Sequence, residues 1–382
     1  MVEDTLPLIS FRDICREIEL CDRYLANCRA QSQVPLEERN KRAYPTGSFL
    51  EFLAYAKMDL NTYGFQMRMP YGSIVRQPSP YRLYRGENTT DYKNTQSSLH
   101  RLLRQHTDET TFYRLHANLL LARFSNVLLK IDRVRQWNYG DVLNDALAQH
   151  YGLNTNLLDL TGDFSSALFF ATTYWDKDFG RLMPITDNVI ASNPKYKYGV
   201  LYFSRQILES ASLLLNDLED KKEILEIGFQ PLMRCSAQSG LVRVCNDKYD
   251  LSTDPNFQKF RFKQSSLLSN FIYKKMDFGK KVFPQADNRL ISDLVDNYIK
   301  QSKAFSADEL KEAIKHSELE GRNRLDLVEL LCQHGISVVP SAQQADYPPD
   351  EVIAEVNKAL PPILDFKEFY GFELTTRLVS FH

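Results

Sequence analysis

The segment Tyr84-Arg85-Gly86 holds a residue combination that could bind an anion. Arg85 is expected at the end of a short strand, where its guanidinium offers a fork of donors that matches a phosphate or a carboxylate. Gly86 beside it would let a ligand approach the backbone closely. The structural alternative, a buried Arg85 paired with a carboxylate, is equally favoured by the residues alone. The sequence therefore predicts either an anion site or an ion pair at Arg85.

Polar residues between Gln149 and Thr161 form a second candidate site. Gln149, His150, Asp159 and Thr161 lie in an otherwise apolar stretch. Each would cost about 1–3 kcal/mol if it were buried without a hydrogen bond. We therefore expect a hydrogen-bonded network in which Asp159 is buried and anchors the segment. His150 and Asp159 could instead form a two-residue metal site of a hydrolase or nuclease, but a structural, hydrogen-bonded histidine is favoured over it.

Several well-known motifs are missing from the sequence. It has no His-Glu-x-x-His, Gly-x-Ser-x-Gly, Walker or Gly-x-Gly-x-x-Gly pattern, and only 15 of its 382 residues are glycine. Phosphoryl transfer of the P-loop kind is therefore not expected. The 6 cysteines form no Cys-x-x-Cys pair, and the spacing of Cys15, Cys21 and Cys28 is typical of a helix stripe that faces a core. We predict reduced thiols, no disulfide and no bound metal.

Composition and charge limit the class of protein further. Charged residues make up 25% and apolar residues 43% of the chain, and the formal net charge is −2, as in an ordinary globular protein. This balance does not supply the positive field that non-specific nucleic-acid binding needs. No apolar run is long enough for a membrane span, and the acidic start is unlike a signal peptide. The sequence predicts a cytoplasmic protein without membrane contact.

Hydrophobic spacing and turn residues predict a mixture of helices and short strands. Helices are expected over residues 10–31, 48–56, 95–131 with a break near 107–110, 141–149, 165–175 and 286–300. Strands are expected over 81–84, 156–160, 198–203, 240–244 and 259–262. Because the two kinds of element do not alternate regularly, we predict an α+β fold with a small mixed or antiparallel sheet core flanked by helices.

The chain changes character near residue 303. Ser306 with Glu309 predicts a capped helix, another helix is expected over 326–334, and residues 340–362 are rich in proline and polar side chains. We predict an N-terminal helical extension over 1–47, a central domain over 48–302 and a C-terminal helical extension over 303–382.

The two polar segments together resemble the signature of the FRG domain family. Its aromatic-Arg-Gly start is matched at 84–86, and its centre, Gln-His-Tyr-Gly-x-x-Thr-x-Leu-Leu-Asp-x-Thr followed by Ala-Leu-x-Phe-Ala, is matched at 149–161 and 167–171. Residues 98–101, Arg234 with 238–240, and 282–287 resemble further elements of the family, so the resemblance spans about 48–300. This resemblance identifies the central domain as an FRG domain.

The sequence departs from the family pattern at several positions. Asn154 and Asn156 stand where the family tends to have Pro and Arg. Glu87 replaces the usual Gln, and Gly162-Asp163 replaces Asn-Pro. The first of these changes removes a cation from the expected cleft.

A weaker similarity to ADP-ribosyltransferases implies roles for individual residues. In that family an Arg, a Ser or Thr, and a Gln or Glu on three strands build the cleft that binds NAD. By position, Arg85 would hold the dinucleotide phosphates, Thr161 would brace the site and Gln238 would orient the ribose. The implied catalytic residues are Arg85, His150, Thr161 and Gln238, and the implied cofactor-binding residues are Arg85, Gly86, Glu87, Tyr151 and Asp159.

The function implied is an ADP-ribosyltransferase-like enzyme or pseudoenzyme that binds NAD in a cleft around Arg85. Gln238 lacks the carboxylate that would stabilise positive charge on the ribose, so an acid such as Glu87 or Glu226 would have to serve. The alternative is a non-catalytic module of a bacterial defence or toxin system that senses a nucleotide or another ligand, or binds a protein partner.

Overall fold

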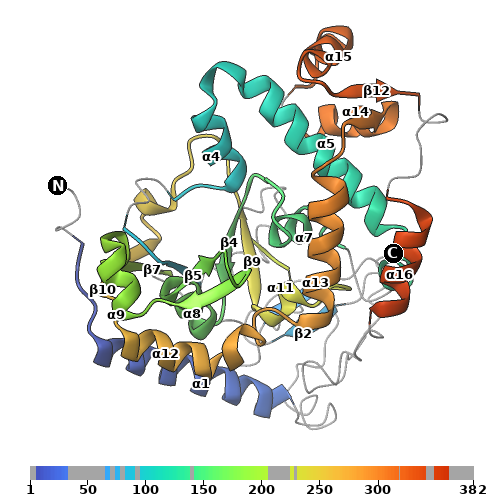
Figure 1. Cartoon of the computed structure of the whole chain (residues 1–382). Coiled ribbons are helices and arrows are strands. Elements are labelled where there is room, and N and C mark those ends of the chain that lie inside the picture. The colour runs from blue at the N-terminus through green and yellow to red at the C-terminus, as the bar shows by residue number, and fades with distance from the viewer. Residues whose placement is uncertain are drawn as a thin grey trace, which may run out of the picture.

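The structure is a computed structural model that describes residues 6–32, 65–68, 74–77, 82–90, 95–137, 142–204, 224–227, 230–317, 319–340 and 348–360. Its helices and strands form an α+β fold in which helices pack around a central sheet (Figure 1). The predicted fold class is confirmed, whereas its likeness to ADP-ribosyltransferases stays a prediction. The helix expected over 48–56 lies outside the described residues.

Among the described residues, the main sheet has six strands in the order β10-β7-β3-β4-β9-β8, and every neighbouring pair is antiparallel. Along the chain these strands are β3 (Tyr84–Glu87), β4 (Leu157–Thr161), β7 (Tyr198–Ser204), β8 (Ile224–Glu226), β9 (Gly240–Val244) and β10 (Phe257–Lys263). Tyr84 on β3 pairs with Thr161 on β4. The two polar segments of the sequence thus lie side by side inside the sheet.

Three smaller strand pairs complete the β-structure that is described. Antiparallel pairs are formed by β1 (Phe65–Arg68) with β2 (Ile74–Gln77) and by β5 (Thr173–Asp176) with β6 (Arg181–Pro184). A parallel pair is formed by β11 (Ala304–Ser306) with β12 (Ser337–Val339).

The helices lie mostly around the main sheet (Figure 1). The longer ones are α1 (Phe11–Ser32), α4 (Ser98–Gln105), α5 (Thr110–Leu128), α7 (Asn144–His150), α8 (Phe164–Thr172), α12 (Ser266–Lys275), α13 (Gln285–Leu294), α14 (Ala307–Lys315), α15 (Arg324–Gln333) and α16 (Asp350–Ala359). Short helices are α6 (Asp132–Arg135), α9 (Asp187–Ser192) and α11 (Arg234–Ala237), and a π-helix (Val295–Ile299) continues α13. No described helix is long and apolar enough to cross a membrane.

Helix α8 packs directly on β3 and β7, and its sequence explains why it forms there. Asp163 caps its first turn, because the carboxylate accepts hydrogen bonds from the backbone N–H groups of Ser165 and Ser166, each at 3.0 Å. Phe164 and Leu168 are fully buried in a core that also contains Tyr84. The Gly162-Asp163 departure from the family pattern therefore supplies the helix cap.

Helices α1 and α12 lie along the outer side of α8 (Figure 1). Ile14, Ile18 and Cys21 of α1 are buried in the same core, with the helical spacing that the sequence predicted. This helix prediction is confirmed within one residue at each end. The described cysteine side chains, Cys15, Cys21, Cys235, Cys245 and Cys332, are all free thiols, and that of Cys28 is outside the described residues.

The C-terminal helices pack on α5, which belongs to the central domain in sequence (Figure 1). Phe112 and Leu115 of α5 share a core with Phe305 and Leu310. Three elements of this C-terminal region, α14, α15 and β12, form one group at the end of α5, while α16 lies against α13. The domain limits at 47 and 302 stay predictions.

Two local differences from the sequence prediction have simple causes. The strand expected over 81–84 runs over 84–87, because β7 provides backbone partners for Tyr84 through Glu87; Arg85 and Gly86 thus lie within a strand. Helix α8 ends at Thr172, and residues 173–176 form a strand instead of a last helical turn. The β-branched and aromatic residues in this stretch favour a strand.

The described residues also include α16, a helix within the proline-rich tail that was not predicted. Pro349 immediately precedes it, a position that proline tolerates at the start of a helix.

Candidate functional site

Asp159 is at the centre of a polar network on the face of the sheet that carries α7 and α11. Strand side chains alternate between faces, and Asp159 pairs in register with Val242, which is buried in the core beside α7. The Asp159 side chain is nevertheless 44% exposed. The prediction that Asp159 is buried is therefore wrong, because the described neighbours hold its backbone but leave the carboxylate half open to solvent.

Gln149, on α7, fixes the orientation of this carboxylate. Its Nε2 donates to Asp159 Oδ1 at 2.5 Å, and its Oε1 accepts a hydrogen bond from the hydroxyl of Thr155. Thr155 is fully buried, and its hydroxyl oxygen also accepts from the backbone N–H of Leu157 at 3.1 Å. The predicted network around Asp159 is thus present, with Thr155 as a member that the sequence analysis did not single out.

His150, the last residue of α7, lies beside the same carboxylate. It is buried, and its Nε2 is 3.8 Å from Asp159 Oδ1 without a hydrogen-bond partner among the described residues. Burial, together with the nearby Arg234 cation, lowers the pKa of His150, although Asp159 opposes this shift. The imidazole is therefore neutral at neutral pH, with a nitrogen available to accept or donate a proton.

Thr161 and Gln238 are close to one another but are engaged with the backbone. The Thr161 hydroxyl donates to the carbonyl of Gln238 at 2.6 Å and accepts from the N–H of Asp163 at 2.9 Å. The Gln238 side chain donates to the carbonyl of Val282 at 3.0 Å. Gln238 caps the end of α11 instead of lying on a strand, so the strand position implied by the resemblance is wrong.

Arg234 is the site residue to which the sequence analysis gave no role. Its guanidinium lies 4.7 Å from the ring centre of Phe283 and 5.5 Å from that of Tyr151. Burial lowers the pKa of Arg234, while Tyr151 and Asp159 act in the opposite direction. Its Nε has no hydrogen-bond partner and it forms no ion pair within the described part of the chain. The only signal in the sequence was the Arg234...Gln238 element of the family resemblance.

Arg85 and Glu87 lie on the opposite face of the sheet. Arg85 Nε is 3.2 Å from Glu87 Oε1, and its Nη1 donates to the backbone carbonyl of Asp159 at 2.8 Å. Burial acts to lower the pKa of Arg85, but Glu87 and Asp159 outweigh it and raise the pKa above the usual value. Glu87 also accepts a hydrogen bond from Thr95 at 3.3 Å. The ion pair that the sequence left open as an alternative is thus formed.

Gly86 faces α8. A Cβ at this position would lie 1.9 Å from the carbonyl oxygen of Ala167 and 2.9 Å from the Cβ of Ala171. The glycine is therefore required for close packing of the helix on the strand. The prediction that Gly86 leaves room for a ligand finds no support in this geometry.

The predicted residues fall into two groups. The first group, on the α7 and α11 side, contains His150, Tyr151, Asp159, Thr161 and Gln238, and Arg234 joins it. The second group, on the other face, contains Arg85 and Glu87, and it touches the first through the main chain of Asp159. Glu226 lies on β8, but its side chain is outside the described residues. Within the described part of the chain, no group of three or more His, Cys, Asp or Glu residues could hold a metal ion.

The comparisons with known proteins agree with the sequence motifs. Residues 81–178 match the FRG domain. This stretch contains β3, β4, α7 and α8, and thus Arg85 and the 149–161 segment, whereas Arg234 and Gln238 lie beyond it. No curated protein and no solved structure matches the chain. The chain therefore carries an FRG domain, to which residues outside the match add the remaining site groups.

Proposed function

We propose that the FRG domain binds a nucleotide or dinucleotide at the group formed by His150, Asp159 and Arg234, with NAD as the ligand that its chemistry suits best. One observation carries this proposal: a half-exposed carboxylate, a neutral imidazole and an arginine that has no acidic partner in the described part of the chain lie together at one site. A charged arginine that no carboxylate neutralises favours an anionic ligand.

The reaction that this site can support is ADP-ribosyl transfer. When the bond between ribose C1′ and the nicotinamide nitrogen breaks, nicotinamide leaves as a neutral base and positive charge develops on the sugar. The Asp159 carboxylate would stabilise that charge. The nucleophile, water or an acceptor side chain, then bonds to C1′ and gives its proton to Nε2 of His150. Asp159 would supply the carboxylate that Gln238 lacks.

Arg234 takes the phosphate-binding role in this proposal. Arg85 already pairs with Glu87 and donates to the Asp159 carbonyl, so its charge is neutralised within the fold and two of its five N–H donors are occupied. The Arg234 guanidinium contacts the aromatic rings of both Tyr151 and Phe283. The earlier prediction that Arg85 binds the pyrophosphate is tested by the same experiment.

The test measures NAD binding by calorimetry and nicotinamide release from labelled NAD. Arg234→Gln is expected to weaken NAD binding about ten- to a hundredfold, because a charge-assisted hydrogen bond contributes roughly 1.5–3 kcal/mol. Arg181→Gln is the matched control, since Arg181 also lies over a phenylalanine ring, 5.8 Å from that of Phe179, but on the β5–β6 hairpin. Asp159→Asn should reduce turnover about a hundredfold with a smaller effect on binding, whereas Asp22→Asn, a similarly exposed carboxylate on α1, should not.

Two results would overturn parts of this proposal. Loss of NAD binding in Arg85→Gln but not in Arg234→Gln would show that Arg85, and not Arg234, binds the phosphates of NAD. Absence of binding at millimolar NAD would favour the alternative, an interaction module such as the sensing part of a bacterial defence or toxin system. That alternative has its own supporting observation, because Trp175 and Phe179 on the β5–β6 hairpin are 61% and 65% exposed.

A further inference from the structure

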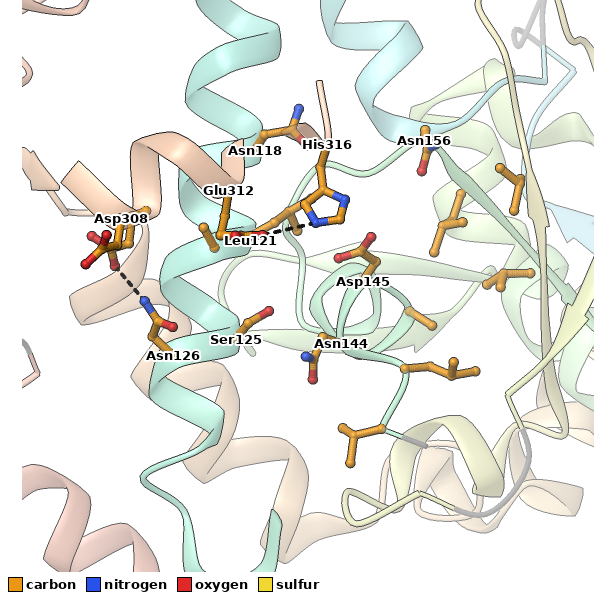
Figure 2. A pocket seen from close by; sticks show the side chains of 18 residues that line it. Asn118, Leu121, Ser125, Asn126, Asn144, Asp145, Asn156, Asp308, Glu312 and His316 are labelled. Atoms are coloured by element: carbon orange, nitrogen blue, oxygen red, sulfur yellow. Dashed lines mark hydrogen bonds and ion pairs between the residues drawn. The ribbon is translucent and has the colours of Figure 1, made fainter. Parts of the chain in front are cut away.

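A cavity of about 580 Å³ lies between α5, α7 and α14 (Figure 2), and its lining residues do not include His150, Asp159 or Arg234. Its inner side is formed by residues of β4 and β9, among them Leu157 and Val242. Cavities of this volume are typical of small-molecule sites and are far larger than a metal ion needs. One wall, α7, belongs to the FRG domain match, and another, α14, belongs to the C-terminal helices.

Carboxylates stand on two sides of this cavity. Asp145 projects from α7, and Glu312 projects from α14 (Figure 2). The described side chains that line the cavity include neither lysine nor arginine. His316 lies 3.5 Å from Glu312 and faces Asp145 (Figure 2), and carboxylates outnumber this imidazole among the described residues that line the cavity. The cavity therefore holds more negative than positive charge.

The Asp145 carboxylate lies in the cavity, where the protein around it partly removes it from water. The Asp145 residue is exposed to solvent, yet the surrounding protein raises the pKa of its carboxyl by desolvation, with His316 acting in the opposite direction. By contrast, Glu309 in the same wall is neutralised, because Arg123 donates to it at 2.5 and 2.8 Å. Asp145 has no such cationic partner bonded to it in the described part of the chain.

Asn118 on α5 adds a hydrogen-bond acceptor to the lining. Asn118 is only 7% exposed, and its Nδ2 donates to the carbonyl of Arg114 at 2.9 Å. The remaining group, Oδ1, is an acceptor with no hydrogen-bond partner among the described residues, and Asn118 lines the cavity next to His316 (Figure 2). The amide oxygen can accept a hydrogen bond from an N–H donor of a ligand in the cavity.

Apolar side chains separate the polar groups. Leu121, Leu157 and Val242 contribute to the lining between the α5, α7 and α14 walls. Asn156, which stands where the FRG pattern has Arg, also lines the cavity. An arginine there would place a cation in the cavity, whereas the asparagine leaves the carboxylates without one.

We propose that this cavity binds a linear polyamine, whose ammonium groups contact Asp145 and Glu312 and whose methylene chain lies against Leu121, Leu157 and Val242. A molecule with two or more separated positive charges and an apolar chain between them matches the arrangement of the lining. Asn118 Oδ1 would accept a hydrogen bond from one of its amines. The inference is independent of the proposed function, since no residue of the Arg234 site takes part.

The test titrates spermidine into the full chain by calorimetry, with 1,8-octanediol as an uncharged chain of similar length. Spermidine should bind and octanediol should not. Asp145→Asn and Glu312→Gln should each weaken spermidine binding at least tenfold. Glu329→Gln, which removes an exposed carboxylate from α15 outside the cavity, should leave the affinity unchanged.

A further variant separates loss of the site from loss of the fold. Asn156→Arg introduces the residue type usual in the FRG pattern, so it should fold and melt normally, yet its cation should abolish spermidine binding. The proposal is overturned if spermidine does not bind at millimolar concentration, if Glu329→Gln weakens binding as much as the cavity variants, or if a folded Asn156→Arg protein binds normally.

Discussion

The two faces of the central sheet treat charged residues in different ways. On one face, Arg85 pairs with Glu87, whose side chain is only 5% exposed and also accepts from Thr95. On the other, Asp159 is half exposed, and Arg234 lies over the Phe283 ring with no carboxylate partner among the described residues. The first face satisfies its charges within the fold, whereas the second leaves them available. The FRG sequence pattern thus contributes both to stability and to a candidate binding site.

Strand β3 stabilises the fold through the close packing of α8 on Gly86. Gly86→Ala tests this role and has the largest expected effect. Its new Cβ would collide with the carbonyl of Ala167 on α8, so the helix must shift, and we expect a loss of about 4 kcal/mol in the free energy of unfolding. Gly180→Ala is the control, because that position has open space and only its positive φ opposes alanine; it should cost about 1 kcal/mol. Denaturant unfolding measures both, and equal effects would contradict close packing at Gly86.

Glu87→Ala sharpens the contrast between the faces. It leaves the partly buried Arg85 guanidinium without its ion-pair partner, which should cost about 3 kcal/mol of stability. Nucleotide binding per folded molecule should be unchanged, since the pair belongs to the closed face. The measurement is unfolding in denaturant followed by calorimetry on the folded fraction. A stable variant that loses NAD affinity would instead place Glu87 in the binding site.

Asp159→Ala should be much milder for stability than Glu87→Ala. The carboxylate is half exposed, and water can replace its hydrogen bond with Gln149, so we expect a cost of about 1 kcal/mol. Nicotinamide release from NAD should be lost in the same variant. If Asp159→Ala destabilised the protein as much as Glu87→Ala, the distinction between an open and a closed face would be wrong.

The smallest expected effect is a pH dependence at His150. Its pKa is lowered in the folded protein from 6.5 by burial, so the unfolded chain takes up the proton first as the pH falls. The stabilisation that depends on a neutral His150 is complete above about pH 6.5 and is lost below it. Wild type should therefore lose more stability than His150→Gln between pH 7 and pH 5. The other titrating groups are common to both proteins, so their contributions cancel in the difference. Parallel curves of unfolding free energy against pH would show that the pKa of His150 is not lowered.

Much of the fold could be predicted from sequence because the signals are local. The stripe of Ile14, Ile18 and Cys21 has helical spacing, and the capping pair Ser306 and Glu309 marks the start of α14. The position of β3 could not be predicted in this way. Its limits depend on which residues of β7 pair with it, and that pairing joins segments far apart in the chain.

The site was predicted less completely, for a similar reason. Motif spacing identified Gln149, His150 and Asp159 as a network, and these residues do lie together. The face on which a strand residue lies depends on register, so sequence alone could not separate Arg85 from Asp159. The importance of Arg234 comes from its contacts with two aromatic rings and from the lack of an acidic partner among the described residues, which only the fold reveals.

The buried pair between Arg123 and Glu309 has a consequence for any shortened form of this protein. Glu309 also accepts from the backbone N–H of Ser306 at 2.8 Å, so the same carboxylate caps α14 and neutralises the charge of Arg123 on α5. A chain that ended at residue 302 would keep Arg123 with its charge buried and its partner removed. The predicted domain boundary at residue 302 would thus break this pair, and a shortened or transferred form of the chain would have to include α14.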